Sequence, residues 1–176
     1  MEFHLATNKI FQAAFMNEAI ATKYITKSEF DLIRQTFPET CSLEDFSSPL
    51  IKEAQKNSKN FCLKILREGG AAGNLFGNEI ESKLAEMETN TQERSKYILM
   101  RFLRPVESEN ILVINGNIDI ATTVTEHSTF GGILIDEQKV IYSTNDGQLI
   151  RTKRAELTSG GLMNGAATIN SLHLTD

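Results

Sequence analysis

The spacing of hydrophobic residues along the chain changes near residue 104. Before this point apolar residues recur every three or four positions, which is typical of helices with one buried face. The first predicted helix follows Thr7 and carries Phe11, Ala14 and Phe15 on one stripe. Capping, proline and glycine signals predict four more helices: one from Thr26 or Ser28 to just before Pro38, one from Pro49 toward Gly69 and Gly70, and two over 78–88 and 92–103.

From Asn110 to residue 152, short runs rich in β-branched residues alternate with turn sequences. The runs are NILVI, IDIATTVTE, GGILID, KVIYST and QLIRT, and NGN, EQ and NDG separate most of them. This pattern predicts an antiparallel meander of about five strands. The predicted fold class is therefore α+β, in which a helical N-terminal half of about five helices packs on the C-terminal β-meander. Residues 158–176 are expected to form a loosely held tail, and 1–176 a single domain.

Composition and charge narrow the classes of partner. The chain has 176 residues, of which 40% are hydrophobic and 23% charged, as expected of one globular domain. Its net charge is −5, and no stripe of Lys and Arg provides the positive field that nucleic-acid binding needs. The nearest basic cluster is Arg151, Lys153 and Arg154, which is interpreted as a solvated strand end. We therefore expect no nucleic-acid partner.

The sequence also bears on location. The first residues lack the apolar core of a signal peptide, and no apolar run approaches the roughly 20 residues that span a bilayer. Two cysteines, Cys41 and Cys62, are too few for a disulfide framework. These features predict a cytoplasmic protein without membrane contact, whereas export by a specialised secretion system would leave no signal in the sequence.

The sequence contains no metal-binding or cofactor-binding motif. His4, His127 and His173 are scattered with the two cysteines and form no CxxC or HxxxH spacing, so no metal site is predicted. The glycine-rich stretches REGGAAGN and TSGGLMNG match neither a phosphate loop ending in Gly-Lys-Ser/Thr nor a dinucleotide fingerprint. The expectation is a protein with no cofactor.

Cys62 and His127 carry the only chemistry that the pattern suggests. If the segment NSKN interrupts the third helix, Ser58 or Asn57 caps a new helix and Cys62 lies in its first turn, where amide donors favour the thiolate. If the helix is continuous from Pro49, Cys62 is a small core residue instead. Both alternatives stay open from the sequence. Cys41 lies among acidic residues, which would raise the pKa of its thiol, and is interpreted as structural.

The strand pairing after His127 suggests a third residue for this site. If Glu137 and Gln138 form a two-residue turn, Asp136 faces Lys139, and continuing that register places His127 opposite Gln148. Asp146 would then be a diagonal neighbour of His127 on the same face and could orient the imidazole. Because Asn145-Asp146-Gly147 is also a turn signal, Asn145 and Gln148 are substitutes for this role.

The segments NFCLKIL, ILVI and HSTFGGILIDEQKVIYST together resemble papain-like cysteine hydrolases of the NlpC-type peptidase and amidase branch, over roughly residues 58–150. Members place a cysteine at a helix start and a histidine at the opening of a strand. The resemblance implies a thiol-dependent hydrolase, amidase or deamidase acting on an amide bond of a peptide or protein substrate. It implies Cys62 as the nucleophile, His127 as general base and then acid, and Asp146 as the orienting residue.

A second class of function also fits the sequence. A non-enzymatic α+β module of the effector or adaptor type would use the helical half to hold a protein partner. A third is an assembly subunit, in which an exposed edge of the meander pairs with another chain. The oligomeric state is left open by the sequence.

Overall fold

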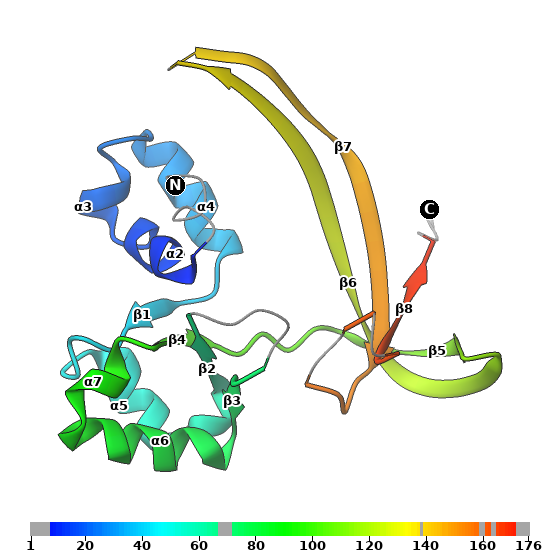
Figure 1. Ribbon diagram of the computed structural model, residues 1–176, viewed down its shortest axis with the longest axis horizontal. Helices are drawn as coiled ribbons and strands as arrows, with labels where there is room; N and C mark the ends of the chain where they lie inside the picture. The colour runs from blue at the N-terminus through cyan, green and yellow to red at the C-terminus, as the bar shows by residue number, and fades with distance from the viewer. Residues whose placement is uncertain (1–7, 67–71, 138, 159–160, 163–164, 172–176) are drawn as a thin grey trace. The chain divides into compact units, whose positions relative to one another are not determined.

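The computed structural model describes residues 8–66, 72–137, 139–158, 161–162 and 165–171 (Figure 1). The chain divides into two compact units, Met1–Leu103 and Arg104–Asp176. The prediction that 1–176 forms a single domain stays a prediction.

The first unit mixes helices and strands along its whole length. Its elements, in chain order, are α2 (Lys9–Phe15), α3 (Glu18–Ala21), α4 (Lys27–Thr36), β1 (Thr40–Ser42), α5 (Pro49–Lys56), the 3-10 helix η1 (Ser58–Asn60), β2 (Phe61–Ile65), β3 (Leu75–Phe76), α6 (Asn78–Thr89), α7 (Thr91–Arg94) and β4 (Tyr97–Arg101). The four strands form an antiparallel sheet in the order β1-β4-β2-β3, in which Leu63 pairs with Leu99.

The predicted fold class is wrong, because this half holds a four-stranded sheet as well as helices. The helix predicted from Pro49 ends at Lys56, and the helix predicted over 92–103 is the short α7 followed by β4. Both errors fall on short apolar runs, FCLKI and YILMR, for which periodicity does not separate a buried strand from a helix. Each run lies in the centre of the sheet, where both of its faces are covered.

The alternation of side chains along β2 and β4 divides the core into two layers. One layer contains Phe61, Leu63 and Leu99, which pack against α5 and α6. Its other buried members are Leu43, Ile51, Ala54, Ile80, Leu84 and Met87. The other layer contains Cys62, Ile98 and Met100, with Ala13 of α2 packed against them. A fully buried Leu or Ile side chain contributes about 1.5–3 kcal/mol, so the α5 and α6 layer is the main source of stability in this unit.

Local capping signals place the helices correctly where they are strong. Thr26 forms a capping box with Glu29 at the start of α4, and this helix ends at Thr36, before Pro38, as predicted. For the first helix, the predicted cap Thr7 lies outside the described residues, and Asn8 accepts a hydrogen bond from the backbone of Ile10 instead.

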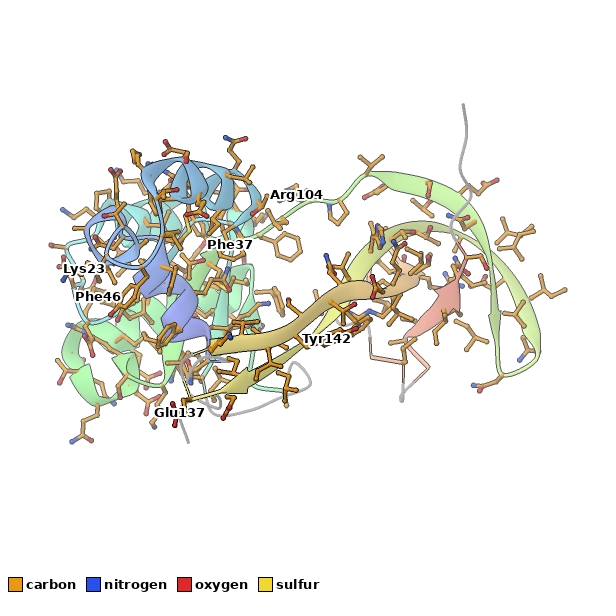
Figure 2. The ribbon with its side chains drawn as sticks, turned by 90° about the horizontal axis from the view of Figure 1, so that it is seen from above. Lys23, Phe37, Phe46, Arg104, Glu137 and Tyr142 are labelled. Atoms are coloured by element: carbon orange, nitrogen blue, oxygen red, sulfur yellow. The ribbon has the colours of Figure 1, made fainter. Side chains whose placement is uncertain are left out.

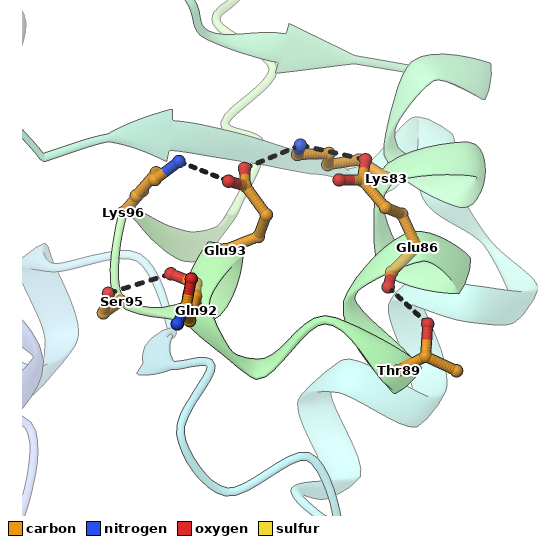
Figure 3. Close-up of polar contacts among 7 residues, drawn as sticks. All are labelled: Lys83, Glu86, Thr89, Gln92, Glu93, Ser95 and Lys96. Atoms are coloured by element: carbon orange, nitrogen blue, oxygen red, sulfur yellow. Dashed lines mark hydrogen bonds and ion pairs between the residues drawn. The ribbon is translucent and has the colours of Figure 1, made fainter.

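Ion pairs connect α6, α7 and the residue that precedes β4 (Figure 3). Lys83 lies 2.9 Å from Glu93 and 3.0 Å from Glu86, and Lys96 also pairs with Glu93. Arg94 donates hydrogen bonds to the carbonyls at the end of α6, 2.7 Å to Met87 and 2.9 Å to Glu88. These contacts satisfy carbonyls that a helix C-terminus leaves without partners, and they fix the turn that leads into β4.

The second unit is built from strands. These are β5 (Glu107–Ile114), β6 (Asn117–Asp136), β7 (Lys139–Arg154) and β8 (Ala167–Asn170), paired antiparallel in the order β5-β6-β7-β8. The turn between β5 and β6 is Asn115-Gly116, and both residues have positive φ, 52° and 79°, as hairpin turns of this length require. Strand β8 lies within 158–176, the segment predicted to be a loosely held tail.

The predicted five-strand meander is also wrong. IDIATTVTE and GGILID form one strand of 20 residues, and Asn145-Asp146-Gly147 continues β7 instead of turning. Gly131 explains why the strands stay paired here, since a Cβ at this position would lie 2.4 Å from the Thr144 carbonyl oxygen. The glycines thus permit a close backbone approach inside the ribbon instead of ending its strands.

The ion pairs of Glu93 predict a pH dependence of stability. Hydrogen bonds from Lys96 and Lys83 lower the pKa of Glu93 in the folded protein. Its stabilising contribution is therefore present above the unfolded pKa of about 4.3 and is lost as the pH falls through the lower folded value. In urea unfolding of the Glu93→Gln variant, we expect stability to fall less steeply below about pH 5 than in the parent chain. Glu44→Gln, at an exposed loop carboxylate, is the control, and equal pH slopes for Glu93→Gln and the parent would contradict the prediction.

Candidate functional site

Cys62 is the second residue of β2, where it pairs with Met100 on one side and Phe76 on the other. Its side chain is 4% exposed. Burial raises the pKa of its thiol, and the opposing influence of Lys64 and Lys9 is smaller. The interruption of the helix at NSKN does occur, but it leads into a strand, so Cys62 does not stand at a helix N-terminus. A buried thiol with a raised pKa is a poor nucleophile at neutral pH.

His127 lies on β6 in the second unit, whereas Cys62 belongs to the first. Asp136 pairs with Lys139 as predicted, but the register shifts twice between this turn and His127. His127 consequently lies opposite Ile150, and Gln148 lies opposite Thr129.

The predicted neighbours of His127 are displaced with the register. Asp146 stands four residues from Ile150 along β7, which places it roughly 13 Å from the position opposite His127. Its carboxylate accepts a hydrogen bond from Thr144 instead. The structure therefore does not bring Asp146 or Asn145 beside the imidazole. His4 and His173 lie outside the described residues.

Two lysines lie beside the face of the first sheet that carries Cys62. Lys64 shares this face because it stands two residues after Cys62 on β2, and Lys9 is the first residue of α2. Partial burial lowers the pKa of Lys9, and the charge of Lys64 lowers it further. Two ammonium groups that raise each other's free energy favour the approach of an anion, which would relieve the repulsion.

A second cationic group lies on β7, in the other unit. Arg151 pairs directly across the sheet with Glu126, and its Nη2 donates a 2.6 Å hydrogen bond to the Glu126 carboxylate. This bond lowers the pKa of Glu126. Lys153 stands two residues further on the same face, and burial followed by the charge of Arg151 lowers its pKa. Two cations facing one carboxylate leave a net positive charge that suits a phosphate or carboxylate.

These cations are candidate residues that the sequence pattern does not reveal. Arg151 and Lys153 stand in a segment whose pattern indicates a solvated strand end, and Lys64 belongs to no motif. A usable signal was present for the first pair, because alternate positions of a strand share one face and the sequence RTK therefore places both cations together.

A cleft of about 520 Å³ opens in the first unit. Its walls include Met16, Phe30, Arg34, Glu39, Glu53 and Arg101. Arg101 binds both oxygens of Glu53 at 2.9 Å and donates a 2.6 Å bond to Glu39. Cys41 also lines the cleft, and burial raises the pKa of its thiol. The positive charge of Arg101 is balanced by two neighbouring carboxylates. This cleft is therefore less suited to an anion than the side of the first sheet near Lys64 and Lys9, called the lysine face of β2 below.

Within the residues that the structure describes, no group of three or more His, Cys, Asp and Glu side chains could hold a metal ion. The described helices include none that is long and apolar enough to cross a membrane.

Comparison with known proteins connects the whole chain with one family. A sequence model described as "Eukaryotic glutathione synthase, ATP binding domain" matches residues 5–174. The glutathione synthetase of Xenopus laevis is 34% identical over 145 residues, which cover 81% of this chain and 30% of that protein. The chloroplastic glutathione synthetase of Arabidopsis thaliana is 28% identical over 174 residues, covering 98% and 32%. The chain thus spans about a third of the length of these relatives.

A solved structure shares the fold. It is the apo form of a glutathione synthetase-like effector from Globodera pallida, with a TM-score of 0.70 and 21% sequence identity. The likeness covers 96% of this chain and 34% of that chain.

These findings overturn the resemblance to papain-like cysteine hydrolases and the thiol hydrolase function drawn from it. The family match covers the residues on which that resemblance relied. In the structure, NFCLKIL enters a strand and not a helix, and HSTFGGILIDEQKVIYST forms most of a long ribbon of β6 and β7. Antiparallel hairpins of this kind occur in many folds, so the hairpin alone carried little family information.

The burial of Cys62 predicts a slow thiol. In a Cys41→Ser variant, Cys62 is the only cysteine that iodoacetamide can modify. In the native protein we expect the pH midpoint of this modification to lie above the ordinary thiol pKa of about 8.5. The midpoint should be the same in the His127→Ala variant and should return to the ordinary value in urea. A native midpoint below the ordinary value that rises in His127→Ala would contradict this prediction.

Proposed function

The chain belongs to the eukaryotic glutathione synthase family, and from this membership we propose that it forms part of the nucleotide-binding region of an ATP-dependent ligase. The observation that carries the proposal is the match of residues 5–174 to a domain described as ATP binding. On this proposal the substrates are small molecules and not the peptide or protein substrate expected of a hydrolase. We also propose a cytoplasmic location for the chain. The relative from Arabidopsis thaliana is named chloroplastic, so location differs within the family.

The lysine face of β2 supports the nucleotide proposal. The triphosphate of ATP is strongly anionic, and lysine ammonium groups are common phosphate ligands in proteins. Lys64 and Lys9 supply two positive charges, and that of Lys64 contributes to the lowered pKa of Lys9. Ile98 and Met100 on the same side of the sheet are 0% and 6% exposed, so they belong to the core and not to the surface that would contact a nucleotide.

The cations of the second unit support binding of a further anionic group. Glu126 accepts a hydrogen bond from one terminal nitrogen of Arg151 and holds the side chain in place. Lys153 adds a second positive charge on the same face. A guanidinium that is already oriented loses less entropy when it binds a phosphate or carboxylate.

Nucleotide binding is testable with the chain as it stands. We expect isothermal titration calorimetry to detect Mg-ATP binding, and Lys64→Gln to weaken it roughly tenfold or more, because a charge-assisted hydrogen bond is lost. Lys52→Gln is the matched control, since Lys52 is an exposed lysine on α5. Equal affinities for the two variants, or no binding by the parent chain, would reject the assignment of Lys64.

A second candidate function is a binding module without turnover. The specific observation that favours it is the fold shared with the glutathione synthetase-like effector of Globodera pallida, across 96% of this chain. Such a module would keep the nucleotide-binding fold and use it to hold a nucleotide or a protein partner.

Turnover separates the two candidates. For the ligase, we expect ADP and glutathione to form in equal amounts from Mg-ATP and the glutathione precursors, and Lys153→Gln to reduce both products, because a cation beside Arg151 is removed. Lys139→Gln, at the far end of β7, is the matched control and should leave turnover unchanged. Mg-ATP binding without either product would instead support the binding module.

A further inference from the structure

The turn between β5 and β6 places a chemically reactive pair of residues in open surroundings (Figure 1). Asn115 and Gly116 form this turn, and both are exposed. Asn115 has a φ of 52°, in the left-handed region that glycine and asparagine adopt more readily than other residues. Apart from its chain neighbours, no heavy atom lies within 4 Å of the position that a Cβ on Gly116 would occupy. The space beside Gly116 is therefore open.

An asparagine followed by a glycine can react within its own chain. The backbone nitrogen of the glycine and the side-chain amide carbon of the asparagine are placed so that a bond between them closes a five-membered ring. Because both groups belong to one chain, the reaction needs no encounter in solution, which favours it strongly. Glycine favours ring closure further, since it has no Cβ to shield its nitrogen or restrict rotation of the backbone.

Neither reacting group of this turn is held by another contact. Among the described residues, the side chain of Asn115 and the backbone N–H of Gly116 have no hydrogen-bond partner. The strand pair next to the turn is Ile114 with Asn117. Opening this one pair lets the turn rotate, while the remaining pairs of β5 with β6 keep the strands together. Ring closure therefore requires a local movement and no unfolding of the sheet.

The chain contains a related dipeptide without this freedom. Asp146-Gly147 lies within β7, the strand on which Figure 2 labels Tyr142. Gly147 pairs with Phe130 of β6, and a Cβ on Gly147 would lie 3.0 Å from the Cβ of Phe130. The backbone of Gly147 is thus closely packed inside a paired strand, and rotation there would disturb pairs on both sides.

A second Asn-Gly sequence occurs at residues 164–165. Asn164 lies outside the described residues, but the backbone N–H of Gly165 donates a 3.1 Å hydrogen bond to the carbonyl of Leu162. This hydrogen bond must break before the nitrogen of Gly165 can react. The sequence alone does not separate the two Asn-Gly pairs, whereas the structure favours reaction at Asn115.

We propose that Asn115 is a site of spontaneous deamidation in the folded protein. The backbone nitrogen of Gly116 gives its proton to hydroxide and forms a bond to Cγ of Asn115. The bond from Cγ to the side-chain nitrogen then breaks, and this nitrogen takes a proton from water and leaves as ammonia. Water adds to one carbonyl carbon of the resulting succinimide and breaks its bond to the ring nitrogen, which takes up a proton. Addition at Cγ gives aspartate, and addition at the backbone carbonyl carbon gives isoaspartate.

The reaction changes the charge and the length of the turn. Both products carry a carboxylate where Asn115 has a neutral amide, and isoaspartate adds one methylene carbon to the path of the backbone. Since a two-residue hairpin turn has a defined backbone geometry, isoaspartate is expected to break the pair of Ile114 with Asn117. The reaction requires no nucleotide, so it stands or falls independently of the proposed ATP binding.

The test incubates the native chain at mildly alkaline pH and follows its peptides by mass spectrometry, with fragmentation that separates isoaspartate from aspartate. We expect both products at Asn115, at a rate that rises in proportion to hydroxide concentration. Asn115 should react roughly tenfold faster than Asn164, because the hydrogen bond of Gly165 protects the second site. In urea the two rates should become similar, because both dipeptides are then free.

The variant Asn115→Gln should lose the products at this position, because its longer side chain cannot close the five-membered ring. The matched control is Asn117→Gln, at an exposed asparagine next to the turn, and it should leave the rate at Asn115 unchanged. Circular dichroism checks that both variants fold. The proposal is overturned if Asn115 reacts only in urea, if Asn115 and Asn164 react equally fast in the native chain, or if Asn117→Gln abolishes the products at Asn115.

Discussion

The antiparallel pairing of β2 with β4 is the constraint on which the first unit depends. Five consecutive residue pairs join these strands, from Phe61 with Arg101 to Ile65 with Tyr97. Because adjacent residues of a strand point to opposite faces, this pairing decides at once which side chains enter the core beneath α5 and α6 and which face the other way. Leu63 and Leu99 fill the helical layer, while Cys62, Lys64 and Met100 share the opposite face. The core layer beneath α5 and α6 and the side of the sheet on which Lys64 stands are thus two results of a single register.

Sequence reasoning succeeded where a short local signal decides the structure. The helix start at Thr26 or Ser28, the stop before Pro38 and the Asp136 with Lys139 pairing all depend on a few adjacent residues. It failed where tertiary contacts decide. YILMR is apolar enough for a helix or a buried strand, and only its position between β1 and β2 selects the strand. Asn145-Asp146-Gly147 has turn chemistry, yet pairing with β6 on both sides keeps it extended.

The candidate site was less predictable than the fold, for a physical reason. A thiol and an imidazole attract attention as reactive groups, whereas a phosphate site can be assembled from ordinary lysines and arginines on strands that are distant in sequence. Lys9 and Lys64 are 55 residues apart, and the charge of one influences the other only because α2 packs, through Ala13, on the side of the sheet that carries Cys62. The acidic net charge of −5 led to the expectation of no nucleic-acid partner, but local charge and not net charge decides whether a small anion binds at a site.

The two register shifts in the ribbon have a consequence for the cations of β7. Both shifts add their extra residue to β7, which places Lys139 opposite Asp136 at one end and Arg151 opposite Glu126 at the other. Each added residue exchanges the two sides of the strand relative to its partner, and a second one restores them. The side on which Arg151 and Lys153 stand is therefore a matter of parity. Loss of one residue from the tip of β7 that the pairing did not absorb would turn both cations to the opposite side, whereas loss of two would keep them on the same side and shift them by two positions along β6.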